Sequence, residues 1–397
     1  MEDLLAHEHA AHQNVYDLMR REDERVTTVI TAFATYRSLC QAVVFADFEN
    51  QAEQKEAQLW QAHVAGKAYF VKALRNLRKI DSDNEVAHRA MSEYFLRWIK
   101  ASNKFYREHV YKVSLAFGIP ELQAVALAVK TEASPVFDRP AANIGSTLRA
   151  IITQSCHQSL IYLGDLSRYR ASEGLDKRPD FGPAFGFYSL ASRICPSSGM
   201  GHHQQAVIAL ELKEHLRAIY HLYRSICVAQ PHPLAQRNLS IEIDKTISAW
   251  DKNELIQKGP PNDPEASKKV LIGWYVRLQS ICFKGEKTRG FDELEREVLT
   301  QLATILKKRD IDNALARMVS VNIAAQHTSI ENYKSKSGLI SDLTNTLTHF
   351  KRSRLRRLRR LSIRHCASTF ASTPPFLASS RKTYFMLPAT PVRSMLI

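Results

Sequence analysis

Apolar residues spaced about 3.6 apart recur along most of this sequence, and they restrict the fold more than any other feature. Segments 28–49 and 52–79 have this spacing over their whole length. In segment 93–122, one helix face collects Phe95, Trp98, Ile99, Phe105, Tyr106, Val110, Val113 and Phe117. Gly118 and Pro120 then stop the helix. No segment alternates apolar and polar residues between turn residues, as a strand would. The sequence therefore predicts an all-α fold.

Two later helical segments end in a similar turn. AFGFYSLASRICPSSG and HLRAIYHLYRSICVAQPHP each combine aromatic and small residues, and their prolines, Pro196 and Pro231, lie 35 residues apart. This spacing is close to that of tetratricopeptide (TPR) repeats, in which helical hairpins bury their apolar faces against neighbouring hairpins. QKGPPNDPEAS, 257–267, predicts a linker, and three more helical segments follow it. We expect a solenoid-like stack of helical hairpins.

The net charge of +15 would favour a nucleic-acid partner, but its distribution is uneven. Eleven of the 55 basic residues and none of the 40 acidic residues lie after Phe350, which leaves 44 basic and 40 acidic residues before it. The excess belongs mainly to segment 351–397. This segment is predicted to be a disordered tail, and it also has the composition of an out-of-frame extension.

Within this tail, KRSRLRRLRRL, 351–361, is the strongest run of positive charge. Leucines recur there at every third position, which is compatible with a basic amphipathic helix. A solvated tail, a nuclear-import signal and a nucleic-acid contact all fit this pattern, and the first two are favoured. The candidate nucleic-acid contacts are Arg354, Arg356, Arg357, Arg359 and Arg360.

Motifs for catalysis or metal binding are missing from the sequence. HEHAAH, 7–12, lacks the spacing of a zinc-protease motif, and His202 and His203 have no other ligand at a suitable distance along the chain. The sequence contains no phosphate-binding glycine loop and no nucleophile elbow. It has no run of 18 apolar residues to span a membrane. We therefore expect no enzymatic activity, cofactor, metal or membrane partner.

The stretch LIYLGDLSRYRAS, 160–172, gathers charged and aromatic residues on one helix. Asp165 and Tyr169 lie one turn apart, with Arg168 beside them. Asp165 and Arg168 could form an ordinary surface ion pair, which contributes little. Alternatively, Arg168 and Tyr169 could bind a phosphate, because arginine offers a fork of donors that fits phosphate oxygens. That site needs a second cation from a neighbouring helix, and spacing alone favours the ion pair.

Several stretches in series resemble the family of Est-type telomerase-associated proteins and SMG nonsense-mediated-decay adaptors, its fungal members in particular. The matching pieces are CQAVVFADFEN…QLWQAH, FYREHVYKVSLAFGIPEL, YLGDLSRYR, FYSLASRICPSSG, IYHLYRSICVAQPHPLAQRNL, CFKGEKTRGFDELEREVLTQL and MVSVNIAAQ. They cover about residues 28–335. The resemblance implies a 14-3-3-like helical domain stacked on TPR-like hairpins. The expected parts are an N-terminal segment 1–27, a domain 28–256, further hairpins 265–350 and the tail 351–397.

The same resemblance favours the phosphate site. GDLSRY, 164–169, matches a Gly-Asp-x-x-Arg-Tyr run on the helix that lines the phosphoserine groove of the 14-3-3 fold. Arg168 would then bind phosphate, with Tyr169 supporting it. Relatives carry a lysine five residues after the tryptophan that corresponds to Trp60, where this chain has Ala65. We expect Lys72, two turns beyond Ala65, to be the second cation, with Lys67 as its substitute.

The resemblance also implies partners. We expect a non-catalytic adaptor, in the nucleus and cytoplasm, that binds a phosphorylated Ser/Thr segment of a decay-pathway RNA helicase. The alternatives are a telomerase-associated subunit that binds RNA or single-stranded telomeric DNA, and an inert scaffold. GHHQQA, 201–206, departs from the Pro-Tyr-Asn-Gln-Leu-Ala pattern of relatives, so the usual hydrogen bonds of Tyr and Asn need substitutes. One family branch carries a metal-dependent nuclease domain, and we do not expect nuclease activity from this sequence.

Overall fold

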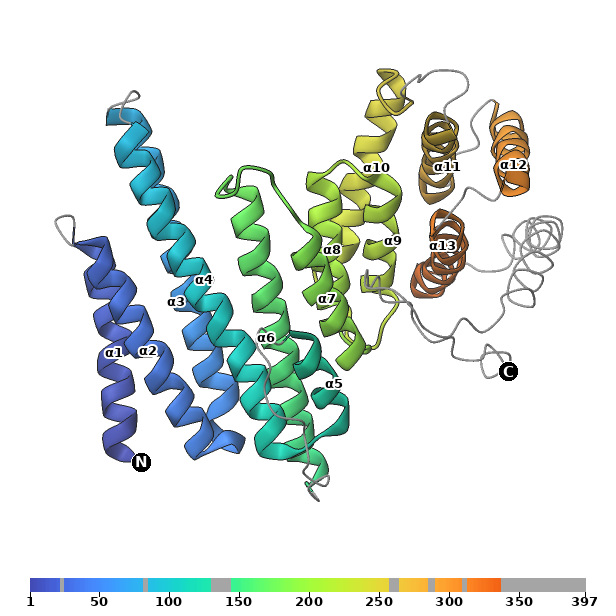
Figure 1. Ribbon diagram of the computed structural model, residues 1–397. Helices are drawn as coiled ribbons and strands as arrows, with labels where there is room; N and C mark the ends of the chain where they lie inside the picture. Colours follow the sequence, from blue (N-terminus) through green and yellow to red (C-terminus); the bar gives the residue numbers. More distant parts are fainter. Residues whose placement is uncertain are drawn as a thin grey trace, which may run out of the picture. The chain divides into compact units, whose positions relative to one another are not determined.

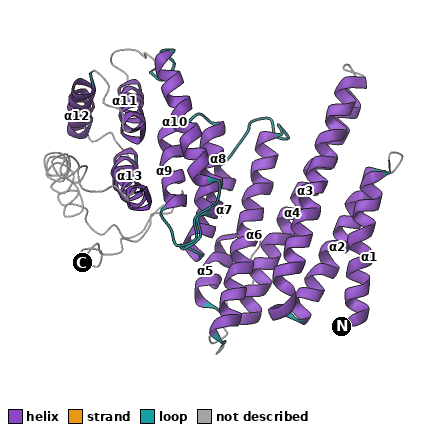
Figure 2. Ribbon diagram, turned by 180° about the vertical axis from the view of Figure 1, so that it is seen from behind, coloured by secondary structure: helices purple, strands orange, loops and turns teal. Residues whose placement is uncertain are grey.

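The computed structural model of the 397-residue chain describes residues 1–21, 25–80, 85–129, 144–256, 264–284, 290–308 and 313–336. These ranges contain helices and turns but no β-strand, which confirms the predicted all-α class (Figure 2). The chain divides into two compact units, Met1–Ile330 and Glu331–Ile397. The helices, labelled in Figure 1, are α1 Glu2–Arg20, α2 Val26–Ala46, α3 Phe48–Ile80, α4 Glu85–Phe117, α5 Pro120–Val129, α6 Ser146–Ser172, α7 Gly182–Ile194, α8 Met200–Glu211, α9 His215–Ile226, α10 Ala235–Asp251, α11 Pro264–Lys284, α12 Phe291–Lys308 and α13 Ala314–Lys336.

Helices α1 to α7 share one hydrophobic core. The apolar face predicted for 93–122 points into it from α4, where Phe95, Trp98 and Tyr106 are fully buried. Trp98 packs edge-on against Phe33 of α2, with ring centres 5.3 Å apart. Each buried aromatic ring contributes about 2 kcal/mol through removal of apolar surface from water. Helix α4 ends at Gly118 as predicted, because this residue adopts a φ of 62°, which a glycine takes without strain.

Helix α2 combines length and apolar composition to a degree that would also suit a membrane span. In this fold its apolar side chains, among them Val29, Phe33 and Val44, are buried in the core instead. Neighbouring helices α1, α3 and α4 pack against α2 and cover these side chains. Helix α2 is thus a core helix of the N-terminal bundle.

A second hydrophobic core lies among α8 to α13. Its centre includes Leu222 of α9, Leu271 of α11 and Val321 of α13. The hydroxyl of Tyr275, on α11, donates to the backbone oxygen of Met318 at 2.8 Å and so ties α11 to α13. Helix α8 contributes Ile208 to the first core and Ala206 to the second. The two cores are therefore continuous through α8.

The turns that contain Pro196 and Pro231 pack directly against each other. Gly199 donates its backbone N–H to Gln230 at 2.9 Å, and the Ser225 hydroxyl donates to Gly199 at 2.8 Å. A side chain at Gly199 would come within 2.4 Å of the Ser225 backbone oxygen. The 35-residue spacing thus marks successive helical hairpins whose turns meet, as the TPR-like pattern predicts.

On α8, His202 and His203 occupy the positions where the family pattern has Tyr and Asn, and both are within hydrogen-bond distance of neighbouring helices. The Nδ1 atoms of His202 and His221 lie 3.1 Å apart, within hydrogen-bond distance. His203 accepts from the Asn238 amide at 3.0 Å, and its ring stacks on His232 with centres 3.6 Å apart. These contacts join α8 to α9 and α10, so the hairpin forms despite the altered motif.

Candidate phosphate-binding site

The Gly-Asp pair of GDLSRY forms the base of the candidate site, where α6 and α7 approach closely. A Cβ atom at Gly164 would lie 2.2 Å from the Tyr188 ring, so only glycine lets this ring rest on the α6 backbone. The Tyr188 hydroxyl then donates to Asp165 at 2.6 Å. Burial raises the pKa of Asp165, while the Arg168 charge and the Tyr188 hydrogen bond oppose that rise.

Asp165 and Tyr188 fix the guanidinium of Arg168. Its Nη2 donates to Asp165 at 3.0 Å, and its Nε donates to the Tyr188 hydroxyl at 3.4 Å. The Arg168 side chain is 19% exposed. Burial alone would lower the pKa of Arg168, but Tyr188 and Asp165 together raise it above its ordinary value. Arg168 therefore stays charged. Its guanidinium carries five N–H donors, which is more than Asp165, Tyr188 and the neighbouring Tyr169 use, so donors are left for an anion.

A lysine of α3 approaches the same place across the ring of Tyr169. The Lys67 ammonium lies 5.3 Å from the centre of this ring, and the Arg168 guanidinium carbon lies 4.9 Å from it. Lys67 also forms an ion pair with Glu173 at 2.7 Å. Burial raises the pKa of Tyr169 to about 12, so its hydroxyl keeps its proton. We call this group, Lys67, Asp165, Arg168, Tyr169, Glu173 and Tyr188, the phosphate notch.

The register of α3 against α6 explains why Lys67 reaches the notch. Trp60 stacks on Tyr162 with ring centres 4.2 Å apart, and Lys67 and Tyr169 each follow seven residues later. Seven residues are almost two full helical turns, so both pairs lie on the facing sides of the two helices. Trp60 therefore sets the face on which Lys67 meets α6.

Lys72 is exposed and lies on another face of α3. It is five residues beyond Lys67, which places it about 140° around the helix axis. The structure thus brings Arg168, Tyr169 and Lys67 together, whereas the expected first choice, Lys72, is not part of this group. The expected order of the two lysines does not agree with this geometry, because the Trp60–Tyr162 contact fixes which side of α3 faces α6.

Two members of the notch escaped the sequence analysis. Tyr188 belongs to α7 and Glu173 follows the end of α6, so their roles depend on packing rather than on the GDLSRY motif. Gly164 was the one signal in the sequence that could have indicated Tyr188. A glycine inside a helix often allows a side chain of another helix to pack closely against it. The ion pair expected from spacing is also present, and it holds the arginine in place.

A second group of cations lies on α9 and α13. The Arg217 guanidinium stacks on the Phe185 ring at 3.4 Å and donates to Glu214 at 3.1 Å, while its Nε has no acceptor among the described residues. Tyr220 and Arg224 follow on the same face of α9 at one and two turns. Burial, followed by the neighbouring charge of Arg217, lowers the pKa of Arg317. We call Arg217, Tyr220, Arg224 and Arg317 the α9 basic surface.

Buried His221 and partly buried His202 lie close to the arginines of this surface. Burial and the charges of His202, Arg217, Arg317 and Arg224 lower the pKa of His221, and burial and Arg224 lower that of His202 to about 4. Both imidazoles are thus neutral at pH 7. The part of the chain that the structure describes holds no group of three His, Cys, Asp or Glu side chains able to bind a metal. The candidate tail residues, Arg354, Arg356, Arg357, Arg359 and Arg360, lie outside the described residues.

Two family models match most of the chain. The model of telomerase activating protein Est1 matches residues 54–174, and that of the Est1 DNA/RNA binding domain matches residues 184–372. The first match contains every notch residue except Tyr188, and the second contains Tyr188 and the α9 basic surface. The second match also extends into the segment that follows Phe350.

Individual relatives agree with these models. The nonsense-mediated mRNA decay factor SMG7 of Arabidopsis thaliana is 26% identical over 211 residues, which are 50% of this chain and 19% of that protein. SMG7 of Danio rerio is 25% identical over 306 residues, 75% of this chain and 24% of that protein. The chain therefore spans about a quarter or less of these relatives' length.

A solved structure shows the same fold. Est1, in a crystal structure of Est1 and Cdc13, superposes with a TM-score of 0.61 at 18% identity, over 88% of this chain and 68% of that chain. The predicted resemblance is confirmed by these matches and by the two family models. The chain belongs to the Est1 and SMG family of telomerase-associated and nonsense-mediated-decay proteins.

Proposed function

We propose that this chain is a non-catalytic adaptor of the nonsense-mediated-decay type, which binds a phosphorylated Ser/Thr segment of a partner protein. Its similarity to SMG7 proteins supports the pathway. By the same analogy, the partner is a phosphorylated RNA helicase of that pathway, met in the nucleus or cytoplasm. The observation that carries the proposal is the pair of cations, Arg168 and Lys67, that converge on the Tyr169 ring.

The notch has the parts that a phosphate site requires. Arg168 is held in place before any ligand arrives, so little conformational freedom is lost on binding. Its free N–H groups can donate to phosphate oxygens, and Lys67 adds a second charged donor. A phosphoserine carries nearly two negative charges near neutral pH, whereas serine carries none. The site should therefore discriminate strongly between the two.

Each cation of the notch already has a carboxylate partner. Arg168 faces Asp165, and Lys67 faces Glu173. The Lys67 and Glu173 side chains are 30% and 25% exposed, so water weakens their pairing. We propose that phosphate takes Lys67 from Glu173, while the more deeply buried Asp165 keeps Arg168 oriented.

A binding assay with an arginine-to-lysine pair tests this function. The probe is a fluorescein-labelled pool of twelve-residue peptides with one central phosphoserine, compared with the same pool carrying serine. We expect at least tenfold tighter binding of the phosphorylated pool. Arg168→Lys keeps a charge beside Asp165 but loses the fork of donors, so this preference should fall at least fivefold. Arg193→Lys, at an exposed position of α7, is the matched control. Equal binding of the two pools by the native chain would refute the proposal.

Nucleic-acid binding is the second candidate, and the α9 basic surface favours it. Arg217 and Arg224 are about 10 Å apart along α9, with Tyr220 between them. Single-stranded nucleic acid binds surfaces of this kind through phosphate contacts to arginine and stacking of bases on aromatic rings. The family model that contains this surface is named for DNA and RNA binding. A telomerase-associated role would follow from this activity.

Salt dependence separates the two candidates. Affinity for fifteen-residue oligo(dT) and oligo(U) should fall steeply with salt if several phosphates are contacted. The variant Arg217→Glu/Arg224→Glu/Arg317→Glu should then bind more weakly, and the logarithm of its affinity should fall less steeply with the logarithm of the salt concentration. A slope that changes only when residues 351–397 are removed would assign the activity to the tail instead.

A further inference from the structure

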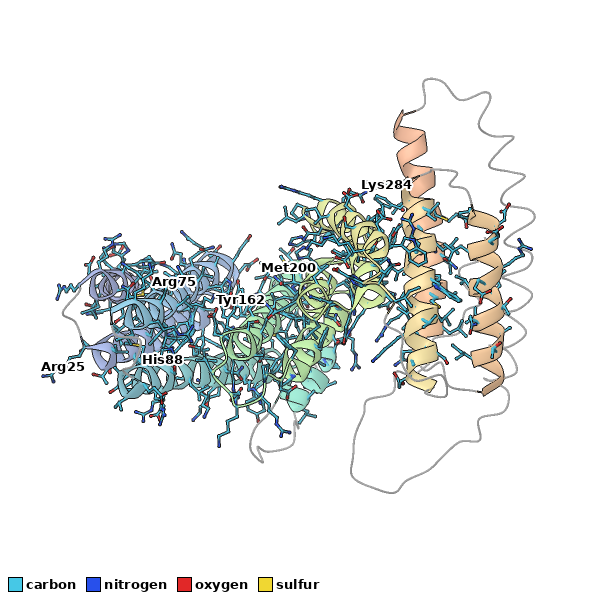
Figure 3. All side chains as sticks on the ribbon, turned by 90° about the horizontal axis from the view of Figure 1, so that it is seen from above. Arg25, Arg75, His88, Tyr162, Met200 and Lys284 are labelled. Carbon is cyan, nitrogen blue, oxygen red and sulfur yellow. The ribbon has the colours of Figure 1, made fainter. Side chains whose placement is uncertain are left out.

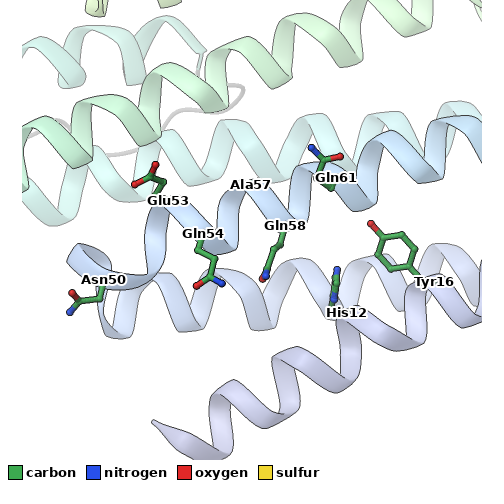
Figure 4. A pocket seen from close by; sticks show the side chains of 8 residues that line it. All are labelled: His12, Tyr16, Asn50, Glu53, Gln54, Ala57, Gln58 and Gln61. Carbon is green, nitrogen blue, oxygen red and sulfur yellow. The ribbon is translucent and has the colours of Figure 1, made fainter.

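A groove of about 630 Å³ runs between α1 and α3, away from both surfaces described above. His12 and Tyr16 form its α1 wall, and its α3 wall carries Asn50, Glu53, Gln54, Ala57, Gln58 and Gln61 (Figure 4). Ala57 opens the groove between the two helices, because every other side chain on the α3 wall is longer. Gln54, Gln58 and Gln61 are at least partly exposed and have no hydrogen-bond partner among the described residues. We call this feature the amide groove.

Toward the C-terminal end of α3, the same face of the helix carries positive charge. Lys72, Arg75 and Lys79 are exposed, and the described residues provide no carboxylate partner for them (Figure 3 labels Arg75). Gln54 and Lys72 are 18 residues apart, as are Gln61 and Lys79, and 18 residues complete five helical turns. Amides and cations therefore lie on one face, about 27 Å apart. Lys72, Arg75 and Lys79 form what we call the basic stripe.

The amide side chains suit the backbone of an extended peptide. Each carries a donor and an acceptor, as a peptide group does. Residues four apart on a helix are about 6 Å apart along its axis. In an extended chain, every second residue presents its backbone groups to the same side. These residues are about 6.6 to 6.8 Å apart. Gln54 and Gln58 can therefore meet successive backbone groups of one strand, while His12 and Tyr16 offer rings to its side chains.

The distribution of charge along this face of α3 indicates which kind of ligand it can bind. The basic stripe attracts negative charge, whereas the residues that line the amide groove include the carboxylate of Glu53 and no lysine or arginine. A nucleic-acid strand carries phosphates along its whole length and would be repelled at Glu53. A peptide can carry acidic residues at one end only. The span of 27 Å corresponds to about eight extended residues.

We propose that this face of α3 binds an extended segment of a partner protein, with its backbone in the amide groove and acidic residues on the basic stripe about eight residues away. The assignment gives Lys72 a role with Arg75 and Lys79, on a face of α3 different from that of Lys67. It does not depend on the phosphate notch.

Three labelled peptides of sixteen residues test the proposal by fluorescence anisotropy with the full chain. One has eight Ser/Thr residues followed by eight Glu residues, one has the reverse order, and one alternates the same residues evenly. We expect one of the two block orders to bind at least tenfold more tightly than the alternating peptide. Equal affinities for all three would overturn the proposal, because charge alone would then explain binding.

Two sets of surface variants locate the site. Lys72→Glu/Arg75→Glu/Lys79→Glu should weaken binding of the preferred peptide at least tenfold, and Gln54→Ala/Gln58→Ala/Gln61→Ala about fivefold. Lys177→Glu/Arg237→Glu/Lys245→Glu, also two lysines and one arginine at exposed positions, should have no effect. Lys67→Glu should leave this binding intact, which separates it from the phosphopeptide function.

Two other occupants would contradict the assignment. If sixteen-residue oligo(dT) displaces the peptide at equal concentration and binds through the amide groove, the ligand is nucleic acid. If the native chain dimerises in sedimentation velocity and the amide-groove variant does not, the groove holds a second copy of this chain. Either result overturns the proposal of a peptide from a different protein.

Discussion

The phosphate notch and the α9 basic surface both rest on arginine, but their charges are balanced differently. In the notch, Arg168 and Lys67 each have a carboxylate partner, so the group is neutral overall. On the α9 basic surface, Glu214 contacts Arg217 and also lies near Arg317, while neither Arg224 nor Arg317 forms an ion pair within the described residues. Positioned cations of the first kind would suit a selective site, and the surplus cations of the second kind would suit long-range attraction of an anionic partner.

The two regions should differ most in the free energy of unfolding that is lost when Arg168 or Arg224 is replaced by alanine. Arg168→Ala leaves Asp165 buried without its cation, which should lower the free energy of unfolding by about 3 kcal/mol. Arg224→Ala, at an exposed position of α9, should change it by less than about 0.5 kcal/mol. Urea unfolding followed by circular dichroism measures both. Equal losses would mean that the notch is not a preorganised unit.

The close approach at Gly164 can be tested with a second glycine. Gly164→Ala places a Cβ atom 2.2 Å from the Tyr188 ring, so it should destabilise the fold by about 2 kcal/mol. Gly186→Ala, in α7, meets no atom within 4 Å and should stabilise it by up to about 1 kcal/mol. Thermal unfolding compares the two variants. A neutral Gly164→Ala would show that Tyr188 does not lie on α6.

Acidification should destabilise the fold through histidines whose pKa is lowered by burial, and His202 is one of them. The pKa of His202 is about 4 in the folded chain, mainly because it is buried, against about 6.5 when unfolded. Between these values the unfolded state binds more protons, so stability falls as pH decreases from 6.5 to 4, by up to about 1.4 kcal/mol per pH unit. The raised pKa of Asp165 has the opposite sign. His202→Gln should flatten the decline measured by urea unfolding at several pH values, and an unchanged slope would contradict this assignment.

The smallest effect concerns the carboxylate that competes for Lys67. Glu173→Gln removes a charge from a partly exposed ion pair, so phosphopeptide binding should become about three- to fivefold tighter. Asp176→Asn, which disturbs the neighbouring Arg170 pair instead, should leave the affinity unchanged. Fluorescence anisotropy with the phosphoserine pool measures both. Weaker binding by Glu173→Gln would show that Glu173 supports the site rather than competing for it.

The fold was largely predictable because its signal is local. The spacing of Phe95, Trp98 and Val110 defines a helix face without knowledge of the neighbours, and Gly118 marks the end of that helix. Successive prolines, Pro196 and Pro231, likewise mark turns that meet in the structure. These features depend on helical periodicity and turn chemistry, both of which are visible in one sequence.

The candidate site was only partly predictable because it forms from three separate places in the chain. The GDLSRY motif identified Arg168 and Tyr169, but the choice between Lys67 and Lys72 depended on which face of α3 meets α6. The Trp60–Tyr162 stack decides this, and a pairing 102 residues apart leaves no local signal. Tyr188 and Glu173 were missed for the same reason.

The most direct test of the phosphate notch compares Lys67 with Lys72, the two lysines of α3. For each variant, the ratio of dissociation constants for the serine and phosphoserine pools measures how strongly the phosphate is recognised. Our account predicts that Lys67→Glu lowers this ratio at least tenfold, whereas Lys72→Glu changes it less than twofold. If Lys72→Glu abolishes the preference and Lys67→Glu retains it, the notch described here is not the phosphate site.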